Sequence, residues 1–331
     1  MKRTCNGTWM DWRWQLRHAV TALDLDFCTM FGLDFAKVDA VQRRYPVRLT
    51  PYALAQLTPC TPDDPINRQM LPLPGELRPE PGIGPDPFAE RGAAACCYGL
   101  KQRFPDRVLV MASALCAMRC RHCTRKGLLD DAEVIRTPEQ LHSALRWIEE
   151  HPRVREVLLS GGDPMLLADA KLLALVRAFA ALPQIDAVRI GTRVLSTLPM
   201  RITPKLAVAL GKSKKVWVNT QFNHARELTD EACTACARLV DAGIPVSNQA
   251  VLLKGVNDSV EALFALCTTL QRNRVRPYYV FLCDPVAGIA PYRVPRRRAK
   301  ALERELATRL GGLAMPRFVA DIPGAPRKMP L

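Results

Sequence analysis

Three cysteines in one short stretch have the residue type and spacing best suited to chemistry in this chain. Cys116, Cys120 and Cys123 lie in CAMRCRHC, directly after the apolar run VLVMASAL. Three thiolates on one loop can ligate three irons of a [4Fe–4S] cluster and leave the fourth iron open. An open iron can chelate S-adenosylmethionine, and one electron from the cluster then releases a 5'-deoxyadenosyl radical. The spacing therefore predicts radical chemistry at an iron–sulfur cluster.

Zinc is the main alternative ligand for these thiolates. His122 lies between two of the cysteines, and a Cys3His set would supply the four ligands of a structural zinc site. Cys233 and Cys236 also form a Cys-x2-Cys pair, but no second pair stands at ligand spacing, so we interpret them as packing thiols. A zinc-stabilised nucleic-acid-binding protein is the alternative from another class of function.

The composition favours a cytoplasmic protein with no membrane partner. The 331 residues are 48% hydrophobic, yet no apolar run approaches the length of a membrane span. The N-terminal segment MKRTCNGTWMDWRWQ lacks the apolar core of a secretory signal. Twelve cysteines in a chain of this size indicate ligands and buried thiols rather than a disulfide framework.

The net charge of +15 leaves the choice of partner open. Its densest run, VPRRRAK over residues 294–300, leads into a predicted helix. We interpret this run as a solvated helix face, and we expect no nucleic-acid partner.

Short apolar strands alternate with amphipathic helices from residue 108 onward. This alternation predicts an α/β fold, a partial (β/α)6 TIM-like barrel with a helical N-terminal region. The expected segments are a helical wrap over 1–104, the barrel over 105–290, and a C-terminal helix and terminal segment over 291–331. The predicted strands are 108–113, 156–160, 187–191, 216–220, 245–253 and 277–283.

Polar residues stand at or near the end of each predicted strand. They are the cysteine loop, Gly161–Gly162–Asp163, Thr192–Arg193, Gln221–His224, Asn248–Gln249 and Asp284. Because chemistry in such barrels is built at the C-terminal ends of the strands, we expect these residues to form one site.

Several of these residues suit ligands, although each also has a plain structural explanation. The pair Gly161–Gly162 lets backbone approach the amino group of S-adenosylmethionine, with Asp163 near a ligand hydroxyl or amine; a tight turn explains the same residues. Arg103 and Arg107 are spaced to bind a phosphate, or to lie in a solvated turn. Arg125, two residues beyond Cys123, is suited to clamp a substrate carboxylate.

Taken together, these residues resemble the lysine 2,3-aminomutase family of radical S-adenosylmethionine enzymes. The resemblance runs from Trp9 nearly to the end of the chain. It implies a 1,2-amino migration on a free amino acid, with a [4Fe–4S] cluster, S-adenosylmethionine and pyridoxal 5'-phosphate as cofactors. The stretches that carry it are CAMRCRHCTRK, LLSGGDP, VRIGTRV with LPMRIT, VNTQFNH, NQAVLLKGVND, PYYVFLCD and DIPGAPRKMPL.

The resemblance also implies roles for the pyridoxal phosphate and substrate residues. Lys328, which by position alone would be a frayed terminal lysine, takes the place of the lysine that carries pyridoxal phosphate. Arg103 and Arg107 are expected to bind this cofactor, and Arg125 the substrate carboxylate. Asp284 and Asp321 match the acidic pair that holds the ε-ammonium in members acting on lysine.

For S-adenosylmethionine, the resemblance places His122, Asp163 and Gln249 around the ligand. The chain departs from the family pattern at Gln221, where a histidine is usual, and at Phe281, where a tyrosine is usual.

We therefore expect an L-lysine 2,3-aminomutase that makes β-lysine. The alternatives are an aminomutase for arginine or glutamate, or a lysine aminomutase that serves the modification of elongation factor P. The predicted partners are the free amino acid and a one-electron reductant such as flavodoxin or ferredoxin, and we expect a homo-oligomer.

Overall fold

The computed structural model describes residues 8–92 and 94–331, and one ten-stranded sheet runs through them. Residues 1–7 lie outside the described residues. They belong to the N-terminal segment whose sequence lacks the apolar core of a secretory signal. The strands follow one another in chain order across the sheet. They are β1 (Ala95–Cys97), β2 (Leu100–Phe104), β3 (Arg107–Ser113), β4 (Glu156–Gly161), β5 (Ala187–Gly191), β6 (Val216–Thr220), β7 (Val246–Leu252), β8 (Arg276–Leu282), β9 (Arg317–Ala320) and β10 (Met329–Pro330).

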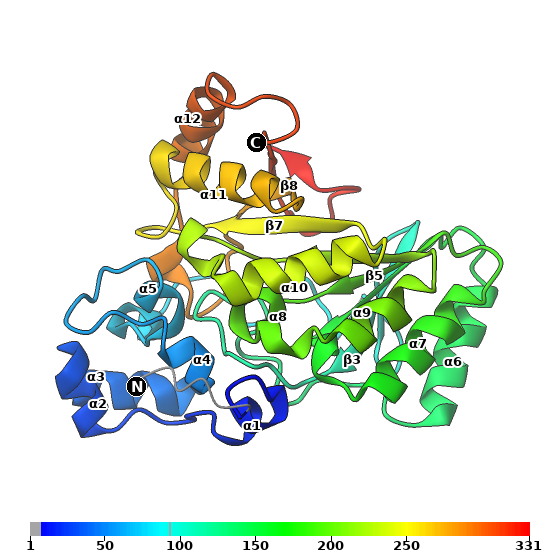
Figure 1. Ribbon diagram of the computed structural model, residues 1–331, viewed down its shortest axis with the longest axis horizontal. Coiled ribbons are helices and arrows are strands. Elements are labelled where there is room, and N and C mark those ends of the chain that lie inside the picture. The colour runs from blue at the N-terminus through cyan, green and yellow to red at the C-terminus, as the bar shows by residue number, and fades with distance from the viewer. Residues whose placement is uncertain (1–7, 93) are drawn as a thin grey trace.

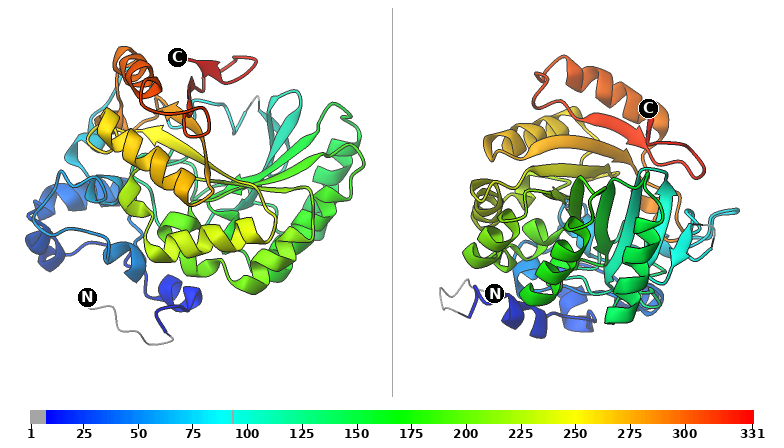
Figure 2. Two further views of the ribbon diagram at one scale, coloured as in Figure 1. Left: turned by 45° about the horizontal axis from the view of Figure 1, so that its top comes forward. Right: turned by 90° about the vertical axis from the view of Figure 1, so that its right-hand side faces the viewer.

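Strands β3 to β9 are parallel, whereas β1 and β2 at one edge and β10 at the other pair antiparallel. The six predicted strands are confirmed as β3 to β8, each within one residue of its expected limits at either end. In the described residues β1 and β10 do not pair with each other, so the sheet is a curved, open barrel, as predicted (Figure 2).

Two edges of the sheet were not predicted from the sequence. Residues 95–104, expected within the helical wrap, form the β1–β2 hairpin, which turns at Gly99 with a φ of +73°. The hairpin covers the edge of β3, whose backbone groups would otherwise be unpaired. At the other edge, β9 is a seventh parallel strand and ends just before Asp321. This single sheet crosses the expected divisions at residues 104 and 290. The division into three segments stays a prediction.

Helices on the outer face of the sheet connect its parallel strands (Figures 1 and 2). The helix α6 (Pro138–Glu149) is capped by Thr137, whose hydroxyl accepts the Gln140 N–H while the Gln140 side chain accepts the Thr137 N–H. Its buried side chains Ala144 and Ile148 join the main core with strand residues such as Val157. The outer helices are α6 (Pro138–Glu149), α7 (Asp169–Ala180), α9 (Pro204–Gly211), α10 (Asp230–Asp241) and α11 (Val260–Arg272).

The N-terminal helices lie together at one side of the molecule, away from α12 (Arg296–Ala307) (Figure 1). They contact the cysteine loop: Met118 is buried in their apolar cluster, and the Arg119 and Arg121 N–H groups donate to the carbonyls of Arg48 and Gln69, each at 3.1 Å. The helical wrap therefore holds the cysteine loop from outside the barrel. Its helices are α1 (Trp12–Arg17), α2 (Leu25–Phe31), α3 (Phe35–Arg44), α4 (Pro51–Leu54) and α5 (Asn67–Met70).

No helix within residues 8–92 and 94–331 is both long and apolar enough to cross a membrane.

Candidate active site

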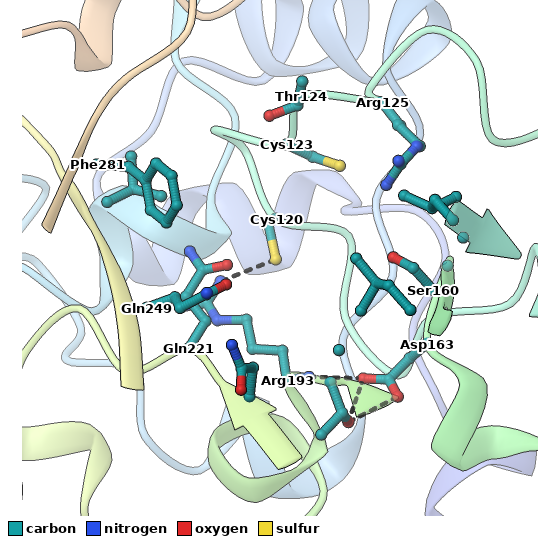
Figure 3. Close-up of a pocket in the computed structure, with 18 of the residues that line it drawn as sticks. Cys120, Cys123, Thr124, Arg125, Ser160, Asp163, Arg193, Gln221, Gln249 and Phe281 are labelled. Carbon is teal, nitrogen blue, oxygen red and sulfur yellow. Dashed lines mark hydrogen bonds between the residues drawn. The ribbon is translucent and has the colours of Figure 1, made fainter. Parts of the chain in front are cut away.

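A cavity of about 370 Å³ opens at the C-terminal ends of the parallel strands. All of the predicted site residues line it, although they come from distant parts of the chain. They are Arg103, Arg107, Cys116, Cys120, His122, Cys123, Arg125, Gly161, Gly162, Asp163, Gln249, Asp284, Asp321 and Lys328. Figure 3 labels Cys120, Cys123, Arg125, Asp163 and Gln249 among them. The expected common site is therefore present, and the role of each residue in it stays a prediction.

The three loop cysteines face this cavity as free thiols. Burial raises the pKa of Cys116 well above its ordinary value, and the neighbouring Cys123 raises it further. Burial also raises the pKa of Cys123, with Cys120 adding to the effect. Cys116 and Cys123 therefore hold their protons more firmly than a free thiol does, and a coordinating metal would remove those protons. The residues fit a [4Fe–4S] cluster in this respect.

Arg193 directly contacts the cysteine loop. It follows β5, and its Nη1 donates a hydrogen bond to the Cys120 Sγ at 2.8 Å (Figure 3). Its Nη2 donates to Gln69 Oε1 at 2.5 Å and to Glu227 Oε2 at 3.0 Å. These partners fix a buried positive charge beside the Cys120 sulfur.

Five buried polar atoms of cavity-lining residues have no hydrogen-bond partner among the described residues. Three are Nε of Arg189, Nε of Arg193 and Oγ1 of Thr220, and two belong to residues expected around S-adenosylmethionine: Nδ1 of His122 and Nε2 of Gln249. The other ring nitrogen of His122 lies 2.9 Å from Gln221 Nε2 and 3.3 Å from Asn223 Nδ2. Buried polar groups are rarely left unpaired, so these orphaned atoms indicate that a polar ligand binds here. The last two fit the expected placement of His122 and Gln249 around S-adenosylmethionine.

Gly161, Gly162 and Asp163 organise the site through the protein itself. The N–H groups of Gly162 and Asp163 donate to the carbonyls of Ser113 (2.6 Å) and Leu115 (2.8 Å) at the start of the cysteine loop. A Cβ on Gly161, whose φ is +112°, would lie 2.3 Å from the Ser113 carbonyl oxygen. The close approach that requires these glycines is therefore made to the cysteine loop, and contact with a ligand stays a prediction.

The Asp163 carboxylate is likewise engaged by the chain. It accepts hydrogen bonds from the Thr192 hydroxyl at 2.7 Å and from the Arg193 N–H at 2.7 Å, which ties the end of β4 to the end of β5. Burial raises the pKa of Asp163 to about 6.

Asp321 and Lys328 meet at the other side of the cavity. The Asp321 carboxylate accepts hydrogen bonds from Arg103 at 2.6 and 3.3 Å and lies 3.7 Å from the Lys328 Nζ. Burial lowers the pKa of Lys328 to about 8, although Asp321 opposes the shift. A buried lysine with a lowered pKa has a larger unprotonated fraction near neutrality and fits the attachment of an aldehyde cofactor.

Asp284 lies on the same side of the cavity and accepts a hydrogen bond from the Thr124 hydroxyl at 2.9 Å. Burial raises the pKa of Asp284 to about 6, and the negative charge of Asp321 contributes to the shift. Asp321 is thus close enough to Asp284 to affect the ionisation of Asp284, which fits the acidic pair expected from the sequence.

The three arginines predicted to bind anions all have partners within the chain. Arg103 pairs with Asp321 and Arg107 with the adjacent Asp106 at 2.9 Å. Arg125 makes two hydrogen bonds to Glu90, at 2.7 and 2.6 Å.

Three residues of this site were not predicted from the sequence. Glu90 and Phe88 come from a turn-rich stretch that gave no catalytic spacing, and Phe88 stacks 3.6 Å from the Arg103 guanidinium. Arg189 lines the cavity from β5 and pairs with Glu156. Arg189 lies in the stretch VRIGTRV, and side chains along a barrel strand alternate between the interior and the exterior. This alternation is the signal that could have identified Arg189 as a residue of the site.

Comparison with known proteins agrees with this geometry. Residues 111–267 match the family model of the Radical SAM superfamily. The chain is 38% identical to the L-lysine 2,3-aminomutase of Acetoanaerobium sticklandii over 98% of its own length and 78% of that protein. It is 36% identical to that of Clostridium subterminale, covering all of this chain and 80% of the relative. The glutamate 2,3-aminomutase of Clostridioides difficile is 32% identical over 98% of this chain and 78% of that protein.

The open α/β barrel, the three cysteines at its mouth and the family match define a radical SAM enzyme, with a [4Fe–4S] cluster and S-adenosylmethionine as its cofactors. More narrowly, the chain belongs to the lysine 2,3-aminomutase family and is an isomerase. The cofactors expected from the resemblance, including pyridoxal phosphate, are those of this family. A zinc-stabilised nucleic-acid-binding protein finds no support among these relatives.

Proposed function

We propose that this enzyme moves the α-amino group of L-lysine to the neighbouring carbon and forms β-lysine. The observation that carries the proposal is the contact between Asp321 and Lys328. Here the chain's own lysine ammonium, largely buried, lies 3.7 Å from one member of the acidic pair, with Asp284 in the same cavity wall. Two carboxylates beside a buried ammonium form a site suited to a lysine side chain.

Each group of residues has a distinct task in this proposal. Cys116, Cys120 and Cys123 hold the cluster, and Lys328 holds pyridoxal phosphate. When bound, the cluster and S-adenosylmethionine supply a radical that abstracts hydrogen, and pyridoxal phosphate supplies a group that carries the migrating nitrogen. Asp321, with Asp284 in the same cavity wall, would hold the substrate ammonium through its negative charge.

The same carboxylates argue against glutamate as the substrate. A glutamate side chain would bring a third negative charge to Asp284 and Asp321, so additional protons would have to be bound. Arginine carries the correct charge, but its planar guanidinium is bulkier and requires two parallel acceptors. Lysine therefore agrees best with the site, although a glutamate enzyme is among the relatives.

The test is an anaerobic assay of the reconstituted enzyme with lysine, arginine and glutamate, in which chromatography separates α- and β-amino acids. We expect β-lysine to be the main product. Efficient conversion of arginine or glutamate, with lysine left unchanged, would reject the substrate assignment. A radical SAM enzyme needs a one-electron reductant, which is added to this assay as a chemical reagent; flavodoxin or ferredoxin as the natural donor, and a homo-oligomeric state, stay predictions.

A further inference from the structure

A short loop before the sheet holds two of the cavity arginines. Glu90 accepts hydrogen bonds from Nε and Nη2 of Arg125, at 2.7 and 2.6 Å, and Phe88 stacks on the guanidinium of Arg103 at 3.6 Å. Both loop residues are buried, with exposed fractions of 7% for Glu90 and 8% for Phe88. Nothing in the spacing of cysteines, glycines or carboxylates along the sequence points to this loop.

The loop has a fixed shape of its own. The Asp86 carboxylate accepts the N–H of Glu90 at 2.9 Å and the N–H of Arg91 at 3.0 Å, which closes a turn over residues 86–91. The Arg91 side chain pairs with Asp131 at 3.3 Å on the surface. The position of the Glu90 carboxylate is therefore set by the loop backbone before any ligand arrives.

The pairing leaves one side of the Arg125 guanidinium available. A guanidinium has two edges that can each bind a carboxylate through two parallel N–H groups. Glu90 occupies the edge formed by Nε and Nη2, so Nη1 and the second N–H of Nη2 remain for another acceptor. Arg125 lines the cavity, and this second edge suits a carboxylate brought by a ligand.

Burial makes the pairing of Arg125 with Glu90 energetically important. The side chains of Arg125 and Glu90 are only 17% and 9% exposed, and a buried guanidinium without a counter-charge is costly. Glu90 compensates the charge of Arg125 and at the same time fixes the plane of its guanidinium. A lysine at this position could not replace the arginine, because an ammonium has no second edge.

We propose that Glu90 is a positioning residue for the substrate α-carboxylate, acting by holding Arg125 with one edge of its guanidinium turned toward the cavity. The inference rests on the proposed function and on the expectation that Arg125 receives that carboxylate. The contrary possibility is that Glu90 competes with the substrate for Arg125. The two differ in sign, because removal of the Glu90 charge weakens substrate binding in the first case and strengthens it in the second.

The experiment measures the binding of L-lysine and of L-lysinamide, which lacks the carboxylate charge, to the reconstituted enzyme through the absorbance of bound pyridoxal phosphate. Glu90→Gln should weaken lysine binding about ten- to hundredfold, a loss of the size found when a group that orients a metal-binding side chain is removed. Lysinamide binding should not change. Glu90→Asp should restore part of the affinity, and in turnover the KM for lysine should rise more than kcat falls.

Asp131→Asn is the matched control, because it removes the surface anchor of the same loop and should leave lysine binding unchanged. Tighter lysine binding in Glu90→Gln would overturn the proposal in favour of competition. An equal loss for lysine and lysinamide would also overturn it and would show a general structural role. If the parent enzyme itself binds lysine and lysinamide equally well, Arg125 does not receive the substrate carboxylate and the proposal for Glu90 falls, whereas the proposed function fails only if the activity assay yields no β-lysine.

Discussion

The guanidinium of Arg193 donates a hydrogen bond to the sulfur of Cys120 at 2.8 Å. Positive charge and hydrogen bonds at a cluster sulfur stabilise the reduced state. Arg193→Gln should therefore lower the midpoint potential of the cluster, on the order of tens of millivolts. An EPR-monitored redox titration measures the change. Arg238, whose guanidinium binds the carbonyl of Ile202, provides the control variant Arg238→Gln; an identical potential in Arg193→Gln and parent would contradict the expectation.

Cys116, Cys120 and Cys123 should be the only cluster ligands, because they share one short loop in the cavity wall. Cys283, which also lines the cavity, follows β8 and lies far from this loop in the sequence. Replacing any one by Ala should abolish the absorbance near 400 nm and the iron content of anaerobically purified protein. Cys236→Ala removes a buried packing thiol of α10 and should leave both unchanged. A cluster of normal iron content in Cys120→Ala would be incompatible with the assignment.

Lys328 should carry pyridoxal phosphate, because burial lowers its pKa to about 8 and it lines the cavity. Borohydride reduction and peptide mapping should place the pyridoxyl group on the peptide that contains Lys328. Lys328→Ala should lose this label but keep the cluster absorbance. A label on Lys254 instead would show that the C-terminal segment has been assigned incorrectly.

Asp321 should determine the preference for lysine. Asp321→Asn removes one of two carboxylates available to the substrate ammonium, so the loss in kcat/KM for lysine should correspond to about 2–5 kcal/mol. The cluster should be unaffected. Asp186→Asn, which breaks the exposed pair with Arg155, serves as the control. If Asp321→Asn converts lysine as well as the parent does, the acidic pair does not select the substrate.

The affinity for lysine should depend on pH through Asp284. Its pKa is raised to about 6 by burial, so its carboxylate is charged above that pH and takes up a proton below it. The KM for lysine should therefore rise as the pH falls through about 6 and stay level between about 6.5 and 7.5. Asp284→Asn should give a high KM with no inflection near pH 6. An inflection that persists in this variant would assign the titration to another group.

The sequence alone was sufficient to predict the cysteine loop, the six strands β3 to β8 and the open barrel. These features depend on local spacing and on the alternation of strands and helices, which short stretches of chain encode. The family resemblance added Lys328 and the acidic pair, which composition and periodicity do not distinguish from ordinary surface residues.

Only the tertiary structure determined which charges are paired. Arg103 meets Asp321 across 218 positions of sequence, and Arg125 meets Glu90 across 35. Such contacts depend on how β9 and the loop over residues 86–91 close around the cavity, and no local pattern specifies them. Burial then sets the pKa shifts of Lys328 and Asp284, because desolvation arises only when distant segments cover a side chain.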